Sequence, residues 1–370
     1  MSNQTVVKES YEMKSPDFID IIKSAITKAT KERGQVNVLI AGKSGVGKST
    51  LINAVFQGDF ATTGPGRPVT QQTREIKKEG VPLTLFDTRG LELKEYKETF
   101  EELENLVENR NNDSNPMNHI HMAWVCIDES SRRVEDAEIE LCKLLANHMP
   151  VIGVITKASS DEGFRLKVLD ILSTVKNVVR VNSVSKTLDD GYVIKPSGLE
   201  ELVELAMEVV PEAQKNAFAA AQRVSMNQKI NKSHAIVATA ATSAAATAAV
   251  PIPFSDALAL VPIQVGMLAG ITSVFGFELE KGFLSTLVSS TITGGGATLL
   301  GRTIVTNLLK MFPGVGSVAG GVIAATTASG LTVAFGEAYI AALAHILQEK
   351  ELPEVKPNDI VVEFKNRFKK

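Results

Sequence analysis

Short apolar runs alternate with helical patterns of apolar and polar residues over the first part of the chain. The apolar runs predict buried strands at 36–41, 82–87, 120–127, 151–156 and 178–182, with a further strand at 72–79 beside 82–87. Helical spacing predicts helices at 48–57, 95–109, 134–147, 162–173 and 197–209. Because strands alternate with helices, the pattern predicts an α/β fold, a doubly wound and mostly parallel sheet with helices on both faces.

A fall in charge separates this part from the rest of the chain. Between Ser233 and Leu347 the charged residues are Asp256, Glu278, Glu280, Lys281, Arg302, Lys310 and Glu337. The uncharged runs are 234–255, 257–277, 283–301 and 311–336. They predict an all-α domain rich in alanine and glycine. We expect five parts: a leader helix at 1–34, an α/β domain at 35–212, a connecting helix at 213–231, the helical domain at 232–350 and a basic tail at 351–370.

Composition narrows the choice of function. The net charge of −3 and the pI of about 6.1 give no electrostatic argument for a nucleic-acid partner. Cys126 and Cys142 lie in apolar contexts and are expected to be reduced core residues of an intracellular protein.

The clearest chemical signal is the octet Gly-Lys-Ser-Gly-Val-Gly-Lys-Ser at 42–49, which fits the pattern G-x-x-x-x-G-K-[ST]. It lies between a predicted strand and a predicted helix, where such a loop turns its amide groups toward phosphate oxygens. Lys48 would reach the β- and γ-phosphates, and the Ser49 hydroxyl would bind Mg²⁺. The residues expected to contact nucleotide here are Gly42, Lys43, Ser44, Gly45, Val46, Gly47, Lys48, Ser49 and Thr50.

A second motif follows the strand at 82–87. Asp87-Thr88-Arg89-Gly90 has the form D-x-x-G, in which the aspartate can hold Mg²⁺ and the glycine amide can meet a γ-phosphate. Thr73 is predicted as a further hydroxyl ligand of Mg²⁺, because it lies next to Arg74 at the start of a strand. Thr70 is the alternative.

Together, GKSGVGKS, Thr73-Arg74, DTRG and Thr156-Lys157 resemble G proteins of the Era-like and TrmE-like branch over about 36–212. The resemblance implies a P-loop NTPase G domain that binds GTP and hydrolyses it to GDP with Mg²⁺, with switch segments at about 60–75 and 87–97. It implies that Lys48, Thr73 and Gly90 act on the γ-phosphate.

The base-recognition motif departs from the family pattern [NT]-K-x-D. Thr156 and Lys157 match, but Ser159 occupies the aspartate position, and Asp161 can replace it only if the loop bulges. Loss of this charge-assisted contact would remove about 1.5–3 kcal/mol, roughly 10–100-fold in guanine preference. Ser183-Val184-Ser185-Lys186 is similar to the last base-contacting motif and supports guanine. An ATPase remains the alternative.

The residue after D-x-x-G also differs from the family pattern. Many relatives have a water-orienting glutamine where this chain has Leu91. We therefore expect slow intrinsic hydrolysis, near ~10⁻⁴ s⁻¹. Lys43, Ser44, self-association or an activating protein would supply the missing group. A nucleotide-gated interaction or membrane-remodelling module with negligible hydrolysis is the alternative. Gly45 stands where potassium-stimulated relatives commonly have asparagine, so potassium activation is not expected.

The uncharged runs are long enough to cross a membrane, which takes about 20 apolar residues. Their small residues equally suit close packing in a soluble bundle. Residues 232–347 resemble the C-terminal helical domain of unknown function in bacterial YcjF-like proteins. This implies association of 232–350 with membrane lipid. We expect a cytoplasmic protein that is associated with the inner face of a membrane. The tail at 352–370 is expected to be a solvated, fraying end, the alternative being contact with anionic lipid.

Overall fold

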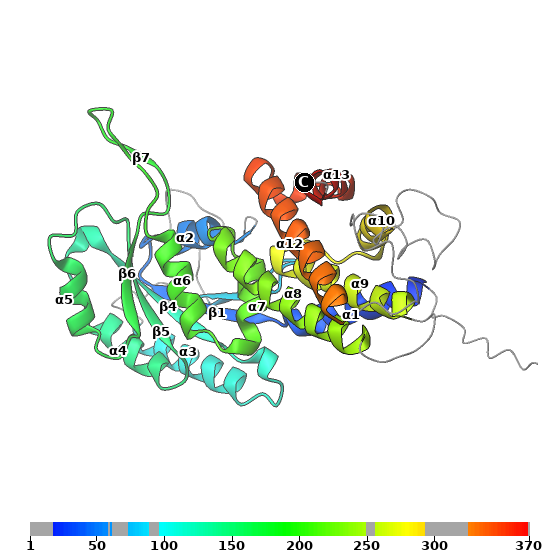
Figure 1. The fold of residues 1–370 in the computed structure, drawn as a ribbon. Coiled ribbons are helices and arrows are strands. Elements are labelled where there is room, and N and C mark those ends of the chain that lie inside the picture. Colours follow the sequence, from blue (N-terminus) through cyan, green and yellow to red (C-terminus); the bar gives the residue numbers. More distant parts are fainter. Residues whose placement is uncertain are drawn as a thin grey trace, which may run out of the picture.

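The computed structural model describes residues 18–57, 60, 73–88, 96–248, 256–292 and 325–368. A sheet flanked by helices occupies one side of the molecule and a group of helices the other (Figure 1). We call these the sheet half and the helical half.

The sheet half is built on six strands in the order β2-β3-β1-β4-β5-β6. The strands are β1 (Val36–Gly42), β2 (Arg74–Lys77), β3 (Leu83–Asp87), β4 (Met122–Asp128), β5 (Val151–Thr156) and β6 (Asn177–Val181). All neighbours pair in parallel except β2, which runs antiparallel to β3 at one edge. Residues of β1, β3 and β5 are buried throughout, as expected for strands covered on both faces. The predicted α/β fold class is confirmed.

Helices cover both faces of this sheet. On one face, α2 (Lys48–Val55), α6 (Leu199–Val209) and α7 (Lys215–Ala221) share a core with Trp124 of β4, whose ring stacks on Phe56 with centroids 5.5 Å apart. On the other face, α3 (Tyr96–Asn111), α4 (Asp136–Ala146) and α5 (Phe164–Ile171) form a second core. A hairpin of β7 (Lys186–Thr187) and β8 (Val193–Ile194), which the sequence pattern does not predict, projects from the body (Figure 1).

The helical half contains α8 (Met226–Ala248), α9 (Asp256–Phe275), α10 (Lys281–Ile292), α12 (Ala325–Glu349) and α13 (Pro357–Phe368). It also contains α1 (Phe18–Arg33), the predicted leader helix. Ile22, Ala25 and Ala29 of α1 are buried in one core with residues of α9, α12 and α13. This core therefore combines a helix that precedes the sheet half in the sequence with helices that follow it.

Two sequence expectations in this region were wrong. The single helix expected at 213–231 is divided between α7 and α8, because the Gln222 side chain accepts from the Ser225 amide at 2.7 Å and closes a turn. The tail is not a fraying end over its described length, because α13 buries Phe364 against Phe335 and Tyr339.

Membrane-spanning potential is limited to one helix among the described residues. Ala328–Glu349 is long and apolar enough to cross a membrane, with a mean hydropathy of 1.5 over its most apolar window, 44% of which is buried. The helix α8 begins before the first uncharged run and covers 234–248 of it, α9 covers most of the second run, and residues 249–255 between the two helices lie outside the description. Much of the third and fourth runs, 293–324, lies outside it too.

The two halves meet where α7 follows the sheet. Gln57, just after α2, donates to the Ala220 carbonyl at 2.7 Å. Nearby, the buried Lys229 ammonium of α8 donates to the carbonyls of Ala219, Ala220 and Phe275 at 2.7, 3.1 and 3.2 Å. One cation thus ties the last turns of α7 and α9, where unpaired carbonyls gather.

Candidate nucleotide site

The phosphate-loop octet has the backbone geometry that its glycines suggested. Gly42 has φ +143°, and a Cβ there would lie 2.5 Å from the Cys126 carbonyl oxygen of β4. Gly47 has φ +103° and caps α2 from the left-handed region. A side chain would be strained at both positions. The loop therefore joins the end of β1 to the first turn of α2, where backbone amides at a helix N-terminus can receive an anion.

Lys48 is folded back over this loop. Its side chain is buried, and Nζ donates to the carbonyl oxygens of Gly42 at 2.8 Å and Lys43 at 3.1 Å. A buried ammonium among neutral carbonyls favours exchange of these acceptors for phosphate oxygens, because attraction between opposite charges is strong where water is excluded. Behind it, burial raises the pKa of the Cys126 thiol to about 12, so that thiol is neutral. Cys142 is also buried and free.

The predicted magnesium ligands come together at the same edge. Asp87 ends β3, is 3% exposed, and lies opposite Ile40 of β1 in register. Arg74 pairs with Asp87 across β2 and β3, which places the adjacent Thr73 beside the same strand end. Ser49 lies in the first turn of α2. One carboxylate and two hydroxyls are oxygen ligands of the kind that Mg²⁺ prefers, so these residues fit the metal. Gly90, Leu91 and Thr70 lie outside the described residues.

The loop after β5 is tied directly to the phosphate loop. The Thr156 hydroxyl donates to the Val46 carbonyl at 2.6 Å and to the Ile127 carbonyl at 3.1 Å. Lys157 has φ +54°, and its ammonium lies 2.6 Å from an Asp128 carboxylate oxygen. Thr156 thus holds the phosphate loop, and Lys157 is fixed by the end of β4.

The other residues predicted to contact the base are Asp161, Ser183 and Val184, and they lie in different surroundings. Asp161 Oδ1 accepts from the Arg165 amide at 2.9 Å and lies 3.4 Å from Arg180 Nε. Ser183 is half-buried and Val184 is 52% exposed at the base of the projecting hairpin.

The structure also brings in residues that the sequence interpretation missed. Glu129, Arg132 and Arg180 all contact the segment 159–161 or its side chains. The sequence held only a weak indication of their role. Glu129 follows a predicted strand, and the carboxyl ends of parallel strands lie at one edge of a sheet. Lys43, expected as a source of the water-orienting group, instead forms an ion pair with Glu135, with Glu138 at 3.9 Å.

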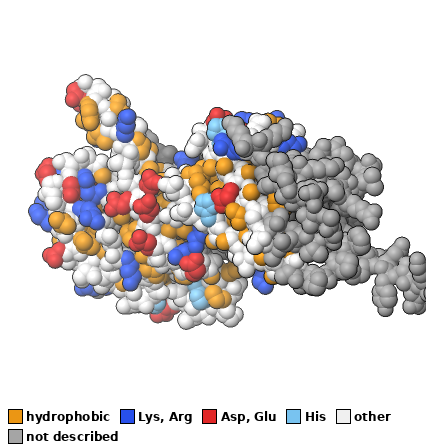
Figure 2. Space-filling model, in the orientation of Figure 1, with side chains coloured by type: hydrophobic (Ala, Val, Ile, Leu, Met, Phe, Trp, Pro, Cys, Tyr) orange, Lys and Arg blue, Asp and Glu red, His pale blue; other side chains and the backbone are white. Residues whose placement is uncertain are grey.

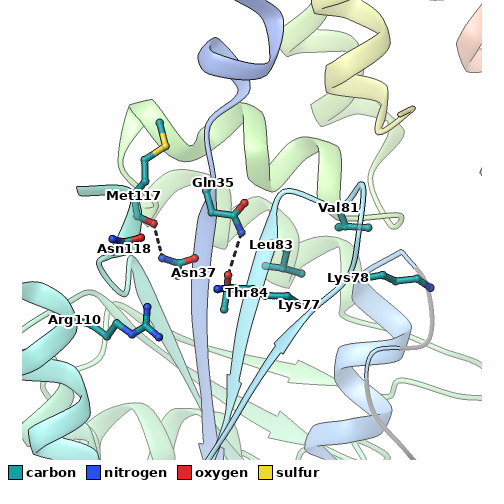
Figure 3. Close-up of a pocket in the computed structure, with 10 residues that line it drawn as sticks. All are labelled: Gln35, Asn37, Lys77, Lys78, Val81, Leu83, Thr84, Arg110, Met117 and Asn118. Atoms are coloured by element: carbon teal, nitrogen blue, oxygen red, sulfur yellow. Dashed lines mark hydrogen bonds between the residues drawn. The ribbon is translucent and has the colours of Figure 1, made fainter. Parts of the chain in front are cut away.

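A separate hollow of about 350 Å³ opens at the opposite edge of the sheet (Figure 3). Its polar walls bond to one another: the Gln35 side-chain oxygen accepts from the Thr84 hydroxyl at 3.1 Å, and Asn37 donates to the Met117 carbonyl at 2.8 Å. It lies at the amino ends of β1 and β3, so it is not the nucleotide site.

Two family models match the chain. Residues 37–157 match a family described as 50S ribosome-binding GTPase, and residues 212–370 match a domain of unknown function, DUF697.

Curated relatives match part of the chain. The tRNA modification GTPase MnmE of Alkaliphilus oremlandii is 26% identical over 182 residues, 48% of this chain and 35% of that protein. MnmE of Paracidovorax citrulli is 31% identical over 152 residues, 35% of this chain and 28% of that protein. Septin-9 of Rattus norvegicus is 25% identical over 166 residues, 38% of this chain and 29% of that protein. The chain thus spans only 28–35% of the length of these relatives.

Solved structures give weaker likenesses. A probable GTP-binding protein, engB, has 17% identity and a TM-score of 0.34, covering 47% of this chain and 98% of that chain. Era of Aquifex aeolicus bound to GDP.AlF4- has 20% identity and a TM-score of 0.35, covering 56% of this chain and 67% of that chain.

Proposed function

Because residues 37–157 match a GTPase family and residues 212–370 match DUF697, we propose that this chain is a GTP-hydrolysing switch. GTP would bind with its phosphates on 42–49, and water would attack the γ-phosphorus as the bond to the β-phosphate oxygen breaks. GDP and phosphate are the products. The observation that carries the proposal is the buried Lys48 ammonium, held at the mouth of the loop by two carbonyl oxygens.

Each residue has a task in this proposal. Lys48 neutralises charge that develops on the transferred phosphoryl group, and the loop amides hold the phosphates in place. Ser49, Thr73 and Asp87 would hold Mg²⁺, which neutralises phosphate charge when bound. The Gly90 amide would meet the γ-phosphate. Because Lys43 is already paired with Glu135, we assign the water-orienting role to Ser44, a second copy of the chain or an activating protein.

The test compares nucleotide binding and single-turnover hydrolysis by the full chain. We expect GTP to displace a labelled GDP far better than ATP does, with hydrolysis near ~10⁻⁴ s⁻¹ in the absence of a partner. Lys48→Ala should lose at least about 100-fold in GTP affinity, since it removes an ionised donor from a buried site. Lys143→Ala, on exposed α4 surface, is the control.

The outcomes separate the alternatives. Tight GTP binding with no turnover would favour a nucleotide-gated module, and preferential ATP binding would favour an ATPase. No binding of either nucleotide with magnesium would overturn the proposal altogether.

We further propose that the helical half acts at the cytoplasmic face of a membrane. Figure 2 shows hydrophobic side chains gathered on part of the described surface of the helical half. The apolar helix Ala328–Glu349 supports this proposal, and 44% burial of its window leaves part of that window accessible to lipid. Carbonate extraction and sedimentation with anionic vesicles test it. Recovery of the protein in the supernatant of both experiments would count against membrane association.

A further inference from the structure

The loop at 157–162, here called the base loop, is held along its amide side by one buried carboxylate. Glu129 is 2% exposed, and its Oε2 accepts from the backbone amides of Ser159 and Ser160, the latter at 3.0 Å. Ser159 is the residue that stands where the family pattern has aspartate. The Glu129 carboxylate is therefore committed to the backbone of this loop and does not extend toward a base.

The backbone carbonyls of the base loop are held by Arg132, three residues after Glu129. The Arg132 guanidinium donates to the Asp161 carbonyl at 2.6 Å and to the Ser160 carbonyl. Its Cζ lies 5.6 Å from the centroid of the Phe164 ring. Arg132 itself adopts φ +50°, an uncommon conformation for a residue with a side chain. Two side chains after β4 thus fix both hydrogen-bonding edges of one short segment.

Arg180 connects Glu129 to the only carboxylate in the Thr156–Asp161 segment. Its Nε donates to Glu129 Oε1 at 2.6 Å and lies 3.4 Å from Asp161 Oδ1. Burial raises the pKa of Glu129, but hydrogen bonds from Arg180, Ser159 and Ser160 outweigh it and leave that pKa below its usual value. Glu129 remains an anion, and Arg180 is held between two carboxylates.

The base loop begins beside the phosphate loop. Thr156, the residue before it, bonds to Val46 of the phosphate loop at 2.6 Å. A nucleotide whose phosphates lie on 42–49 would therefore extend its base along this same edge of the sheet. Guanine presents two adjacent N–H donors there, at N1 and at the 2-amino group, whereas adenine presents neither in that arrangement. A fixed carboxylate discriminates between them, because a buried acceptor left unpaired is costly.

We infer that Glu129 is a positioning residue for base selection, which orders the base loop directly and sets the Asp161 carboxylate through Arg180. The inference rests on the proposed guanine-nucleotide function. It assigns guanine preference to a network of Glu129, Arg180 and Asp161 in place of the aspartate that the family pattern puts at Ser159.

The experiment measures the dissociation constants of GDP, inosine diphosphate and ADP for the full chain and its variants. Glu129→Gln keeps the shape of the side chain and removes its charge. We expect the ADP-to-GDP ratio of dissociation constants to fall about tenfold, with ADP affinity within about twofold of wild type. Inosine diphosphate lacks the 2-amino group, so its affinity should fall less than that of GDP. Glu75→Gln, which breaks an arginine pair at β2, should leave the ratio unchanged.

A double variant separates positioning from general stabilisation. If Glu129 acts through Asp161, then Glu129→Gln combined with Asp161→Ala should lose no more guanine preference than Asp161→Ala does. Arg180→Lys retains the charge and offers a second route should Glu129→Gln fold poorly, and it should lower the same ratio. An unchanged ratio in both variants, or equal weakening of all three nucleotides, would overturn the inference. Failure of the wild-type protein to bind any nucleotide would instead refute the proposed function.

Discussion

In the sheet half, each buried strand is one short and mostly apolar run of the sequence, whereas the core of the helical half joins α1 to residues that follow about 200 positions later or more. The sheet core consists mainly of valine, isoleucine and leucine between two layers of helices. The helical core also buries polar pairs, such as Gln264 with Thr332 and Thr272 with Tyr339, each at 2.8 Å. The local sequence therefore specifies the structure of the sheet half well. The structure of the helical half depends on contacts between residues that are far apart in the sequence.

The strongest test of this contrast is the end of the chain. Phe364 of α13 is 1% exposed, and its ring centroid lies 5.1 Å from that of Phe335. Phe364→Ala should lower the free energy of unfolding by about 3–5 kcal/mol, because it opens a cavity in the helical core. Val362→Ala on the same helix, at a side chain 59% exposed, is the control. Equal stability of the two variants in denaturant titrations would show that α13 is not part of the core.

A glycine pair tests the sheet half. Gly42→Ala should cost about 2–4 kcal/mol, because the new Cβ would meet the Cys126 carbonyl and the backbone has positive φ. Gly45→Ala has positive φ but no atom within 4 Å of the added Cβ, so it should cost only about 1–2 kcal/mol. Chemical unfolding curves give both values. A larger loss at Gly45 would contradict the close approach of β1 and β4.

Lys229 tests the junction between the halves. Lys229→Met should lower stability by about 2 kcal/mol near neutral pH, since it leaves the carbonyls of Ala219, Ala220 and Phe275 without this donor. Stability should also depend on pH, because burial lowers the pKa of Lys229 to about 7, well below the ordinary lysine value of 10.5.

The sign of that dependence follows from proton counting. Above about pH 7 the folded protein releases this proton while the unfolded chain keeps it until about pH 10.5. The unfolded state then binds more protons, so wild-type stability should rise with pH relative to Lys229→Met, by at most about 1.4 kcal/mol per pH unit. Parallel stability profiles for the two proteins between pH 7 and 10 would refute this.

The smallest expected effect compares two glycines of α12. A Cβ at Gly336 would lie 2.5 Å from Val237 of α8 and 3.1 Å from Met267 of α9, so Gly336→Ala should cost about 1–2 kcal/mol. Gly330 is exposed and has nothing within 4 Å of the added Cβ, so Gly330→Ala should stabilise the helix by about 0.5–1 kcal/mol. Thermal unfolding measures both changes. Stabilisation by Gly336→Ala would mean that α12 and α8 are not closely packed.

Most of the geometry of the candidate phosphate site could be predicted from the sequence, because the residues that form the loop are neighbours in the chain. The octet at 42–49 contains its own turn residues, its cation and the start of its helix. Register then brings Thr73 and Asp87 to the same edge, as their positions at strand ends suggested. The base loop was less predictable: the partners of Ser159 and Ser160 come from Glu129, about thirty residues earlier, and no spacing rule connects them.

By itself the sequence determined the α/β class of the sheet half, the phosphate loop and the low charge of the region after residue 232, since each depends on neighbouring residues or on composition. Only the tertiary structure decided that α1 and α13 belong to the helical core, and that Glu129 and Arg180 hold the base loop. The physical reason is that burial and ion pairing depend on which surfaces of the folded chain are in contact. The spacing of residues along the sequence does not specify those contacts.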